Sequence, residues 1–220
     1  MAQDELFDGA TFDGWQGNTN EVWSIENGVI AGGSLDGNPH NEYLATKKSY
    51  KNFHLKLDYK LIGTEGFVNG GVQFRSKWLD NTTRNISGYQ ADIGHGFSGF
   101  IYDEHRRNKF LAEGDIDFIS KVEKPGQWNT YEIIADGDLI LLFINGQKVS
   151  VFRENDDSMD HSGLIALQIH GDCKAQISFR NIFIKELPED GVPRTESIMS
   201  RFGNAQPNYP LPPFKDGEFN

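Results

Sequence analysis

A strict alternation of apolar and polar residues from Phe53 to Leu61 constrains the fold of this chain more than any other feature. The segment reads FHLKLDYKL, so every second side chain is apolar and those between are polar or charged. Side chains of a β-strand point to opposite faces with a period of two residues, whereas a helix needs apolar residues three and four apart. The segment therefore predicts a strand with one buried face and one solvated face.

Similar short segments recur along the chain with tight turns between them. The segment WSIENGVIAG contains Asn27-Gly28, and Asp136-Gly137 joins Trp128–Ala135 to Leu139–Ile144; such pairs favour two-residue hairpins. Further strands are expected at Gln147–Phe152, Leu164–His170 and Gln176–Leu187. The charged stretch Arg106–Lys124 is expected to be a loop with one short strand or turn, and no helical pattern separates the strands. This pattern predicts an all-β fold, an antiparallel sandwich or jelly roll.

Composition excludes several classes of protein. The chain has 21 basic and 32 acidic residues, a net charge of −11. Phosphate recognition needs clustered Lys and Arg, so no nucleic-acid partner is expected. No apolar run approaches the ~20 residues of a membrane span. The single cysteine, Cys173, excludes an intrachain disulfide.

The start Met-Ala-Gln-Asp suits an exported chain with a new first Met, although a cytoplasmic protein can begin the same way. We expect a periplasmic or secreted protein.

The composition changes at Pro188, which divides the chain into two parts. Residues 1–187 are expected to form one domain, and residues 188–220 hold six of the eight prolines. This Pro-rich segment predicts an irregular arm that is packed on the domain or partly disordered, with a short helix over Arg194–Phe202. This arm could be a solvated tail, a lid or a dimer contact. A homo-oligomer is therefore one of the expected possibilities.

Three strand-like segments between Asn69 and Arg107 carry unusual polar residues. In Gly71–Arg75 the alternation places Gln73 and Arg75 opposite the apolar side chains, and in Gly88–Ile93 it does the same for Gln90 and Asp92. The third segment, Phe100–Glu104, ends in two carboxylates. A strand built only for stability more often carries Lys, Thr or Ser on its solvated face. These side chains therefore predict a binding site for a polar ligand on the surface of a sheet.

Two kinds of catalytic group can be placed near this face. His170 ends a strand beside Gln168, where an imidazole can act as a general base, although a surface histidine without a role fits equally. Asp92, Asp103 and Glu104 could form an acid pair for glycoside hydrolysis, or ion pairs with Arg75, Arg106 and Arg107. The E-x-D-x-x-E pattern of sandwich glycanases begins at Glu113 but has Phe118 in place of its second Glu. An ordinary two-carboxylate glycosidase is therefore disfavoured.

An ordered set of segments resembles the 3-keto-disaccharide hydrolase family. The segments are LFDGATFDGW, WSIENGVIAG, EYLATKKSYKNFHLKLDYKL, NGGVQFRS, GYQADIG, FIYDEHRR, PGQWNTYEIIADGDLILLFINGQKV, GLIALQIHGD and FRNIFIKEL. Each is weak alone, but together they run in family order from Leu6 to Leu187. The resemblance implies a concanavalin A-like jelly roll of two antiparallel sheets, with the sugar on the concave sheet.

The resemblance also implies an enzyme, a glycoside hydrolase or lyase that acts on glycosides already oxidised to a ketone at C3. The ketone acidifies the C2 proton, so a base can remove it, the C1 substituent leaves by elimination, and water adds back. Such chemistry needs a base, a group that stabilises the enolate and an acid for the leaving group. A non-catalytic carbohydrate-binding domain of the same fold is the alternative, because fold alone does not decide function.

The residues of this chain that would fill these roles are assigned as a hypothesis. His170 is the favoured base, Arg75 would hold the keto or enolate oxygen, and Asp92 and Glu104 would orient hydroxyls or donate a proton. The expected sugar-binding residues are Gln73, Gln90, Gln168, Tyr102, Trp78, Phe97 and Arg106. No cofactor is assigned with certainty, and Asp92, Glu104 and His170 could bind a divalent cation, Mn, Mg or Ca.

Overall fold

The alternating segment that begins at Phe53 is strand β6 (Phe53–Gly66), which lies in the middle of a sheet that we call sheet A. The computed structural model describes residues 4–82 and 84–189. Sheet A also contains β1 (Asp4–Glu5), β3 (Trp23–Glu26), β4 (Val29–Asn38), β11 (Asn129–Asp136), β12 (Leu139–Ile144), β13 (Gln147–Arg153) and β15 (Cys173–Glu186). Its strands run in the order β13-β12-β11-β6-β15-β4-β3, and β1 pairs with β15.

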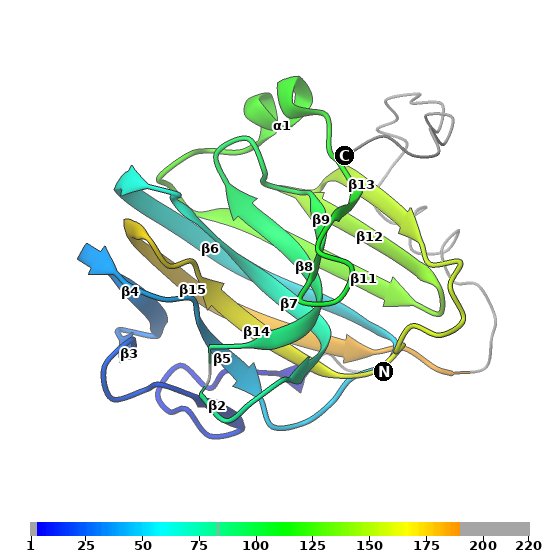
Figure 1. Ribbon diagram of the computed structural model, residues 1–220, viewed down its shortest axis with the longest axis horizontal. Helices are drawn as coiled ribbons and strands as arrows, with labels where there is room; N and C mark the ends of the chain where they lie inside the picture. Colours follow the sequence, from blue (N-terminus) through cyan, green and yellow to red (C-terminus); the bar gives the residue numbers. More distant parts are fainter. Residues whose placement is uncertain (1–3, 83, 190–220) are drawn as a thin grey trace.

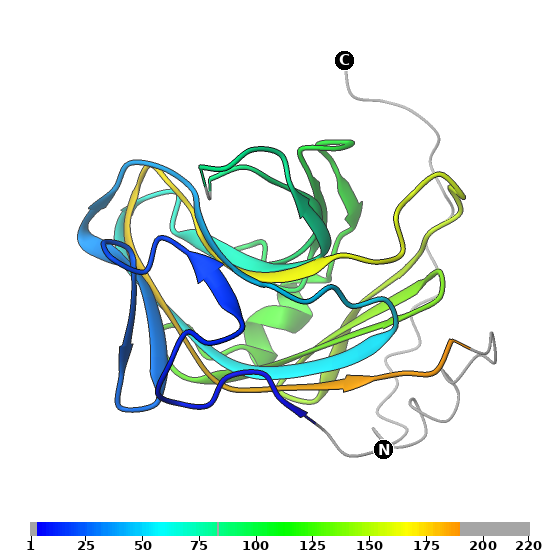
Figure 2. The same ribbon diagram turned by 90° about the horizontal axis from the view of Figure 1, so that it is seen from below.

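A second sheet, sheet B, packs against the first (Figures 1 and 2). Its strands are β2 (Trp15–Gly17), β5 (Glu42–Thr46), β7 (Asn69–Trp78), β8 (Ile86–Gly94), β9 (Ile101–Glu104), β10 (Phe110–Ala112) and β14 (Leu164–Ile169). They run in the order β10-β9-β8-β7-β14-β5-β2. The paired named strands of the described residues are all antiparallel. The predicted all-β sandwich of two antiparallel sheets is confirmed.

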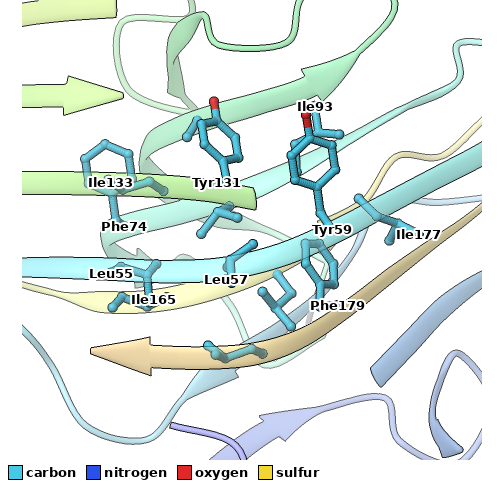
Figure 3. Close-up of a cluster of buried hydrophobic side chains, with 14 of the residues drawn as sticks. Leu55, Leu57, Tyr59, Phe74, Ile93, Tyr131, Ile133, Ile165, Ile177 and Phe179 are labelled. Atoms are coloured by element: carbon cyan, nitrogen blue, oxygen red, sulfur yellow. The ribbon is translucent and has the colours of Figure 1, made fainter. Parts of the chain in front are cut away.

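The hydrophobic core lies between the two sheets. Leu55, Leu57 and Tyr59 of β6 are at most 1% exposed and face the other sheet, while the intervening His54, Lys56 and Asp58 are not part of the core. Figure 3 shows side chains of both sheets meeting in this layer, among them Phe74, Ile93 and Ile165 of sheet B and Tyr131, Ile133, Ile177 and Phe179 of sheet A. Burial of these apolar faces stabilises the fold by about 25 cal/mol per Å² of apolar surface removed from water. It therefore determines which face of each strand points into the core and which face is left for a ligand.

One expectation about secondary structure is only partly right. The stretch Arg106–Lys124 contains the expected short strand, β10, but also a helix that was not expected, α1 (Ile116–Val122). Asp115 caps the helix, because its side chain accepts a hydrogen bond of 2.9 Å from the backbone N–H of Phe118. Only Ile119 of the helix is buried, and a seven-residue helix is too short to show a periodic pattern in the sequence.

The remaining sequence expectations concern the ends of the chain and membranes. Almost all of the Pro-rich arm, including the expected helix Arg194–Phe202, lies outside the described residues. Among the described residues, no helix is long and apolar enough to cross a membrane.

Candidate active site

Polar side chains gather on the outer face of sheet B, the face turned away from sheet A. On β7 and β8 the inward side chains, such as Val72 and Ala91, belong to the core. The alternation therefore turns Gln73, Gln90 and Asp92 outward, as predicted from the sequence. Gln73 and Gln90 lie directly opposite each other on the paired strands.

These three side chains form a hydrogen-bonded chain across the two strands. The Nε2 of Gln73 donates to Oε1 of Gln90 at 2.5 Å, and the Nε2 of Gln90 donates to Oδ1 of Asp92 at 2.5 Å. Gln73 is fully buried and Gln90 is 3% exposed. Buried amides with these partners orient the carboxylate of Asp92 and offer almost no surface to a sugar. Direct contact of Gln73 and Gln90 with a sugar stays a prediction, and both amides are already bonded within this chain of side chains.

Asp92 and Glu104 are two acids with perturbed ionisation on this face. Burial raises the pKa of Asp92 to about 7, and the nearby charge of Glu104 raises it as well, although hydrogen bonds from Gln90 and Asn69 oppose the shift. Burial also raises the pKa of Glu104, against the influence of His105 and His170. Acids that keep a proton near neutral pH can donate it during a reaction.

The pKa of Asp92 predicts a specific pH dependence of stability. The unfolded carboxyl has a pKa near ~3.9, so between about pH 4 and pH 7 the unfolded chain releases a proton that the folded chain keeps. Stability due to this group is complete below pH 4 and is lost as the pH rises through 7. In Asp92→Asn we expect the fall in the free energy of unfolding over this range to be shallower than in the wild type, as measured by urea titration at several pH values. Equal slopes for both proteins would contradict the buried acid.

His170 follows the last residue of β14 and completes the set of titratable groups. Its Nδ1 lies 2.7 Å from the backbone oxygen of Gly171, so Nδ1 carries the proton that is donated there. The lone pair is then on Nε2, the nitrogen that is free to accept a proton. The ring packs edge to face on Phe67 with a centroid distance of 4.8 Å. The influence of His170 on the pKa of Glu104 places the two groups near each other.

An aromatic edge continues from His170 around one side of the site. Ring contacts connect Phe67 to Phe97 at 5.4 Å, Phe97 to Phe110 at 5.8 Å, and Phe110 to Tyr102 at 5.2 Å. Phe67 and Phe110 are 43% and 36% exposed. Aromatic faces of this kind are suited to stacking against sugar rings or apolar substituents. Tyr102 and Phe97 belong to this aromatic edge, so sugar stacking by them stays a prediction, and Phe67 and Phe110 join the edge through ring contacts that the sequence does not reveal.

The opposite side of the site is closed by Trp78 and Tyr43. Trp78 contacts Tyr43 edge to face at 6.3 Å. The hydroxyl of Tyr43 accepts a hydrogen bond of 3.1 Å from Nε2 of Gln168, whose Oε1 is buried without a partner. Burial, together with the charges of Glu104 and Asp92, raises the pKa of Tyr43. Sequence reasoning missed Tyr43, because EYLAT shows no clear alternation and β5 was not expected.

His105 is a second residue that sequence reasoning missed. Its Nε2 lies 3.2 Å from a carboxylate oxygen of Glu104, and its side chain is 38% exposed. It has a φ of 52°, in the left-handed region that bulky residues rarely adopt. A signal was present in the sequence, since His105 directly follows Glu104 in FIYDEHRR.

The expectation that Arg75 shares the face of Gln73 is wrong. Pairing between β7 and β8 shifts after Phe74, and this bulge gives Arg75 a φ of 49°. The side chain points toward the segment just before β6. Its Nε donates to the backbone oxygen of Lys51 at 3.0 Å, and its Nη2 donates to Oδ1 of Asn52 at 3.3 Å. Asn52 in turn accepts from the backbone N–H of Gly137 in the β11–β12 turn. Arg75 is therefore not placed to hold a keto or enolate oxygen on the outer face.

Arg106 is also turned away from the proposed sugar. Its guanidinium lies 4.3 Å from the ring centroid of Tyr89, a core residue, and its Nε donates to Asp103 at 2.6 Å. Asp103 is fully buried and also accepts from Arg107, which pairs with Glu154. The ion-pair alternative is correct for Asp103, and the expectation that Arg106 binds sugar is wrong.

The metal alternative does not fit the observed geometry. In the described ranges 4–82 and 84–189, no group of three His, Cys, Asp or Glu side chains is arranged to hold a metal ion. Asp92 is held by the amides of Gln90 and Asn69, and His170 donates to a backbone oxygen. The expected ligand set of Asp92, Glu104 and His170 is therefore wrong as a preformed metal site.

A jelly-roll sandwich with a polar patch and an aromatic edge on one outer face defines a concanavalin-like domain. Among solved structures, a candidate glycosyl hydrolase of Parabacteroides distasonis is 22% identical and covers 83% of this chain and 93% of its own, with a TM-score of 0.60. The carbohydrate binding module CBM66 of Bacillus subtilis is 18% identical and covers 79% and 96%, also with a TM-score of 0.60. These likenesses show the fold.

Sequence comparison then identifies the family. The profile of the 3-keto-alpha-glucoside-1,2-lyase-like domain matches residues 3–185. A relative from Bacteroides thetaiotaomicron named 3-keto-disaccharide hydrolase is 25% identical, covering 83% of this chain and 77% of the relative. The chain belongs to the family of 3-keto-alpha-glucoside-1,2-lyase-like domains, which confirms the resemblance seen in the sequence and makes the protein an enzyme of the glycoside hydrolase or lyase type.

Proposed function

We propose that this protein cleaves the glycosidic bond of 3-keto-glycosides or 3-keto-disaccharides by elimination followed by hydration. The proposal is supported by two carboxyls with raised pKa values, Asp92 and Glu104, and by the imidazole of His170, which acts on the pKa of Glu104 and whose Nδ1 is bonded to a backbone oxygen. A base and a proton donor are the two groups that such an elimination needs.

In the proposed reaction, Nε2 of His170 takes the proton from C2 of the sugar. The electrons of the C2–H bond form the C1–C2 double bond, and the bond between C1 and the glycosidic oxygen breaks. The proton of Glu104 goes to the departing oxygen, so the leaving group departs as a neutral alcohol. Water then adds across the double bond, with its hydroxyl at C1 and its hydrogen at C2, which completes net hydrolysis.

Asp92 acts on this reaction through Glu104. The charge of Glu104 raises the pKa of Asp92, and burial raises the pKa of both acids, which favours their protonated forms. Glu104 is the better donor because its side chain is 15% exposed, whereas Asp92 is only 4% exposed. Tyr102 and Phe97 would stack on the sugar ring from the aromatic edge.

The test is turnover of a 3-keto-glucoside in D₂O, followed by NMR. Removal of the C2 proton by the enzyme predicts deuterium at C2 of the released sugar and, during the reaction, in recovered substrate if proton transfer is reversible. The unoxidised glucoside is the control, since without the ketone its C2 proton is not acidic and no cleavage is expected. Cleavage of both glucosides at similar rates, or cleavage with no deuterium at C2, would contradict the mechanism.

A calorimetric titration beside the turnover assay tests the carbohydrate-binding alternative, which the exposed aromatic rings favour. A binding domain would retain the 3-keto-glucoside in a calorimetric titration without consuming it. Binding without turnover, for wild type and for His170→Gln alike, would replace the enzymatic proposal with the binding one.

A further inference from the structure

A pocket of about 390 Å³ opens beside the bulge of β7. Three cationic residues, Arg75, Lys77 and Arg106, line it together with the serines Ser49, Ser87 and Ser162 and one acid, Asp160. Asp92, Glu104 and His170 do not line it, although Trp78, which borders the proposed site on the outer face of sheet B, does.

Arg75 is the most unusual residue of this pocket. It is 2% exposed, and its Nη1 is buried without a hydrogen-bond partner. Its bonds go to a backbone oxygen and an amide, and no carboxylate of the described residues forms an ion pair with it. Asp136 and Asp138 act on its charge only through space, and a buried charge without a directly paired counter-charge is costly, which makes an anion a natural partner.

Arg106 presents a second donor of the same kind. Its Nε is bonded to Asp103 and its guanidinium plane lies against Tyr89, but its Nη2 is also buried without a partner. Lys77 adds a more exposed positive charge, although it is 3.2 Å from Asp160. Because hydrogen bonds and ring contacts hold both guanidinium groups, the free N–H groups are fixed in position before any ligand binds.

The backbone at the bulge supports a special role for Arg75. A φ of 49° places a long side chain in the left-handed region, a conformation that costs on the order of 1 kcal/mol or more and is enriched at functional sites. The side chain of Arg75 is thereby turned from the outer face of sheet B, and the residue lines the pocket.

We propose that this pocket binds a small oxyanion, phosphate or sulfate, through the free N–H groups of Arg75 and Arg106. Guanidinium groups are planar multiple donors whose geometry matches the oxygens of such anions. The serine hydroxyls around the pocket can donate to the remaining oxygens. The anion can be free or attached to a larger molecule, and the proposal stands independently of the reaction proposed for the outer face.

Calorimetric titration of the full chain with sodium phosphate and with sodium sulfate at constant ionic strength tests the proposal. We expect saturable binding of at least one anion and a thermal midpoint that rises to a plateau, whereas sodium chloride gives neither. Both anions also stabilise proteins by general exclusion from the surface, but that effect grows without saturation. A rise without a plateau and without binding heat would overturn the proposal.

Arg106→Gln is the main variant, since a fully buried Arg75 could be needed for folding. We expect binding to weaken by about tenfold or more, the usual effect of losing a charge-assisted hydrogen bond. Arg180→Gln is the matched control, because Arg180 also donates its Nε to an aspartate, Asp58, and lies 4.1 Å from the ring centroid of Trp128, but outside the pocket. Equal anion affinity in both variants would contradict the assignment.

Discussion

His170→Gln lowers the rate of cleavage of a 3-keto-glucoside by about a hundredfold to ten-thousandfold, the usual contribution of a general base. Glutamine keeps a polar side chain of similar reach but cannot accept the C2 proton. Since sugar contacts are otherwise retained, the loss is expected in kcat rather than in KM. Initial rates under substrate saturation measure it.

The control for this variant is His161→Gln. His161 is also partly buried and also has a ring nitrogen, Nδ1, 3.0 Å from a backbone oxygen, that of Gly137. It stands in the loop between β13 and β14, away from the carboxyls with raised pKa values, so its replacement should leave the rate within a factor of about two. If His170→Gln retained the wild-type rate, or if both variants lost activity equally, His170 would not be the base.

Asp103→Ala has the largest expected effect on stability, a loss of about 3–5 kcal/mol in the free energy of unfolding. Asp103 is fully buried and accepts hydrogen bonds from the Nε atoms of both Arg106 and Arg107. Removal of its carboxylate leaves two largely buried guanidinium groups beside Tyr89 with less counter-charge. Urea unfolding of the wild type and the variant measures the difference.

Asp160→Ala is the matched comparison for a surface pair. Asp160 lies 3.2 Å from Lys77, and both side chains are more than half exposed. Exposed ion pairs contribute about 0–1 kcal/mol, so this variant should unfold at nearly the wild-type urea concentration. A loss of the same size in both variants would mean that burial of the Asp103 network has no special importance.

Much of the fold follows from the sequence because strand signals are local. The alternation of FHLKLDYKL, the Asp136-Gly137 turn and the apolar LILLFI segment each depend on neighbours within a few residues, and β6, β11 and β12 appear where they were predicted. The same alternation correctly turned Gln73, Gln90 and Asp92 to one face. The short helix α1 escaped detection because seven residues give too little periodicity.

The site was less predictable, because its properties arise between strands that are distant in the sequence. Tyr43 of β5 accepts a hydrogen bond from Gln168 of β14, although the two residues are 125 positions apart in the sequence. The aromatic edge likewise connects residues as distant in the sequence as Phe67 and His170. The raised pKa of Asp92 comes chiefly from burial, which no local pattern reveals.

The sequence by itself determined the all-β class, the family and the outward faces of most strands, because period-two alternation requires only that one side of a strand be buried. Only the tertiary structure decided on which side Arg75 lies. A bulge is set by how β7 pairs with β8, and a shift of one residue sends a side chain to the opposite face. That single displacement separates an arginine from the proposed sugar site and places it in a pocket suited to an anion.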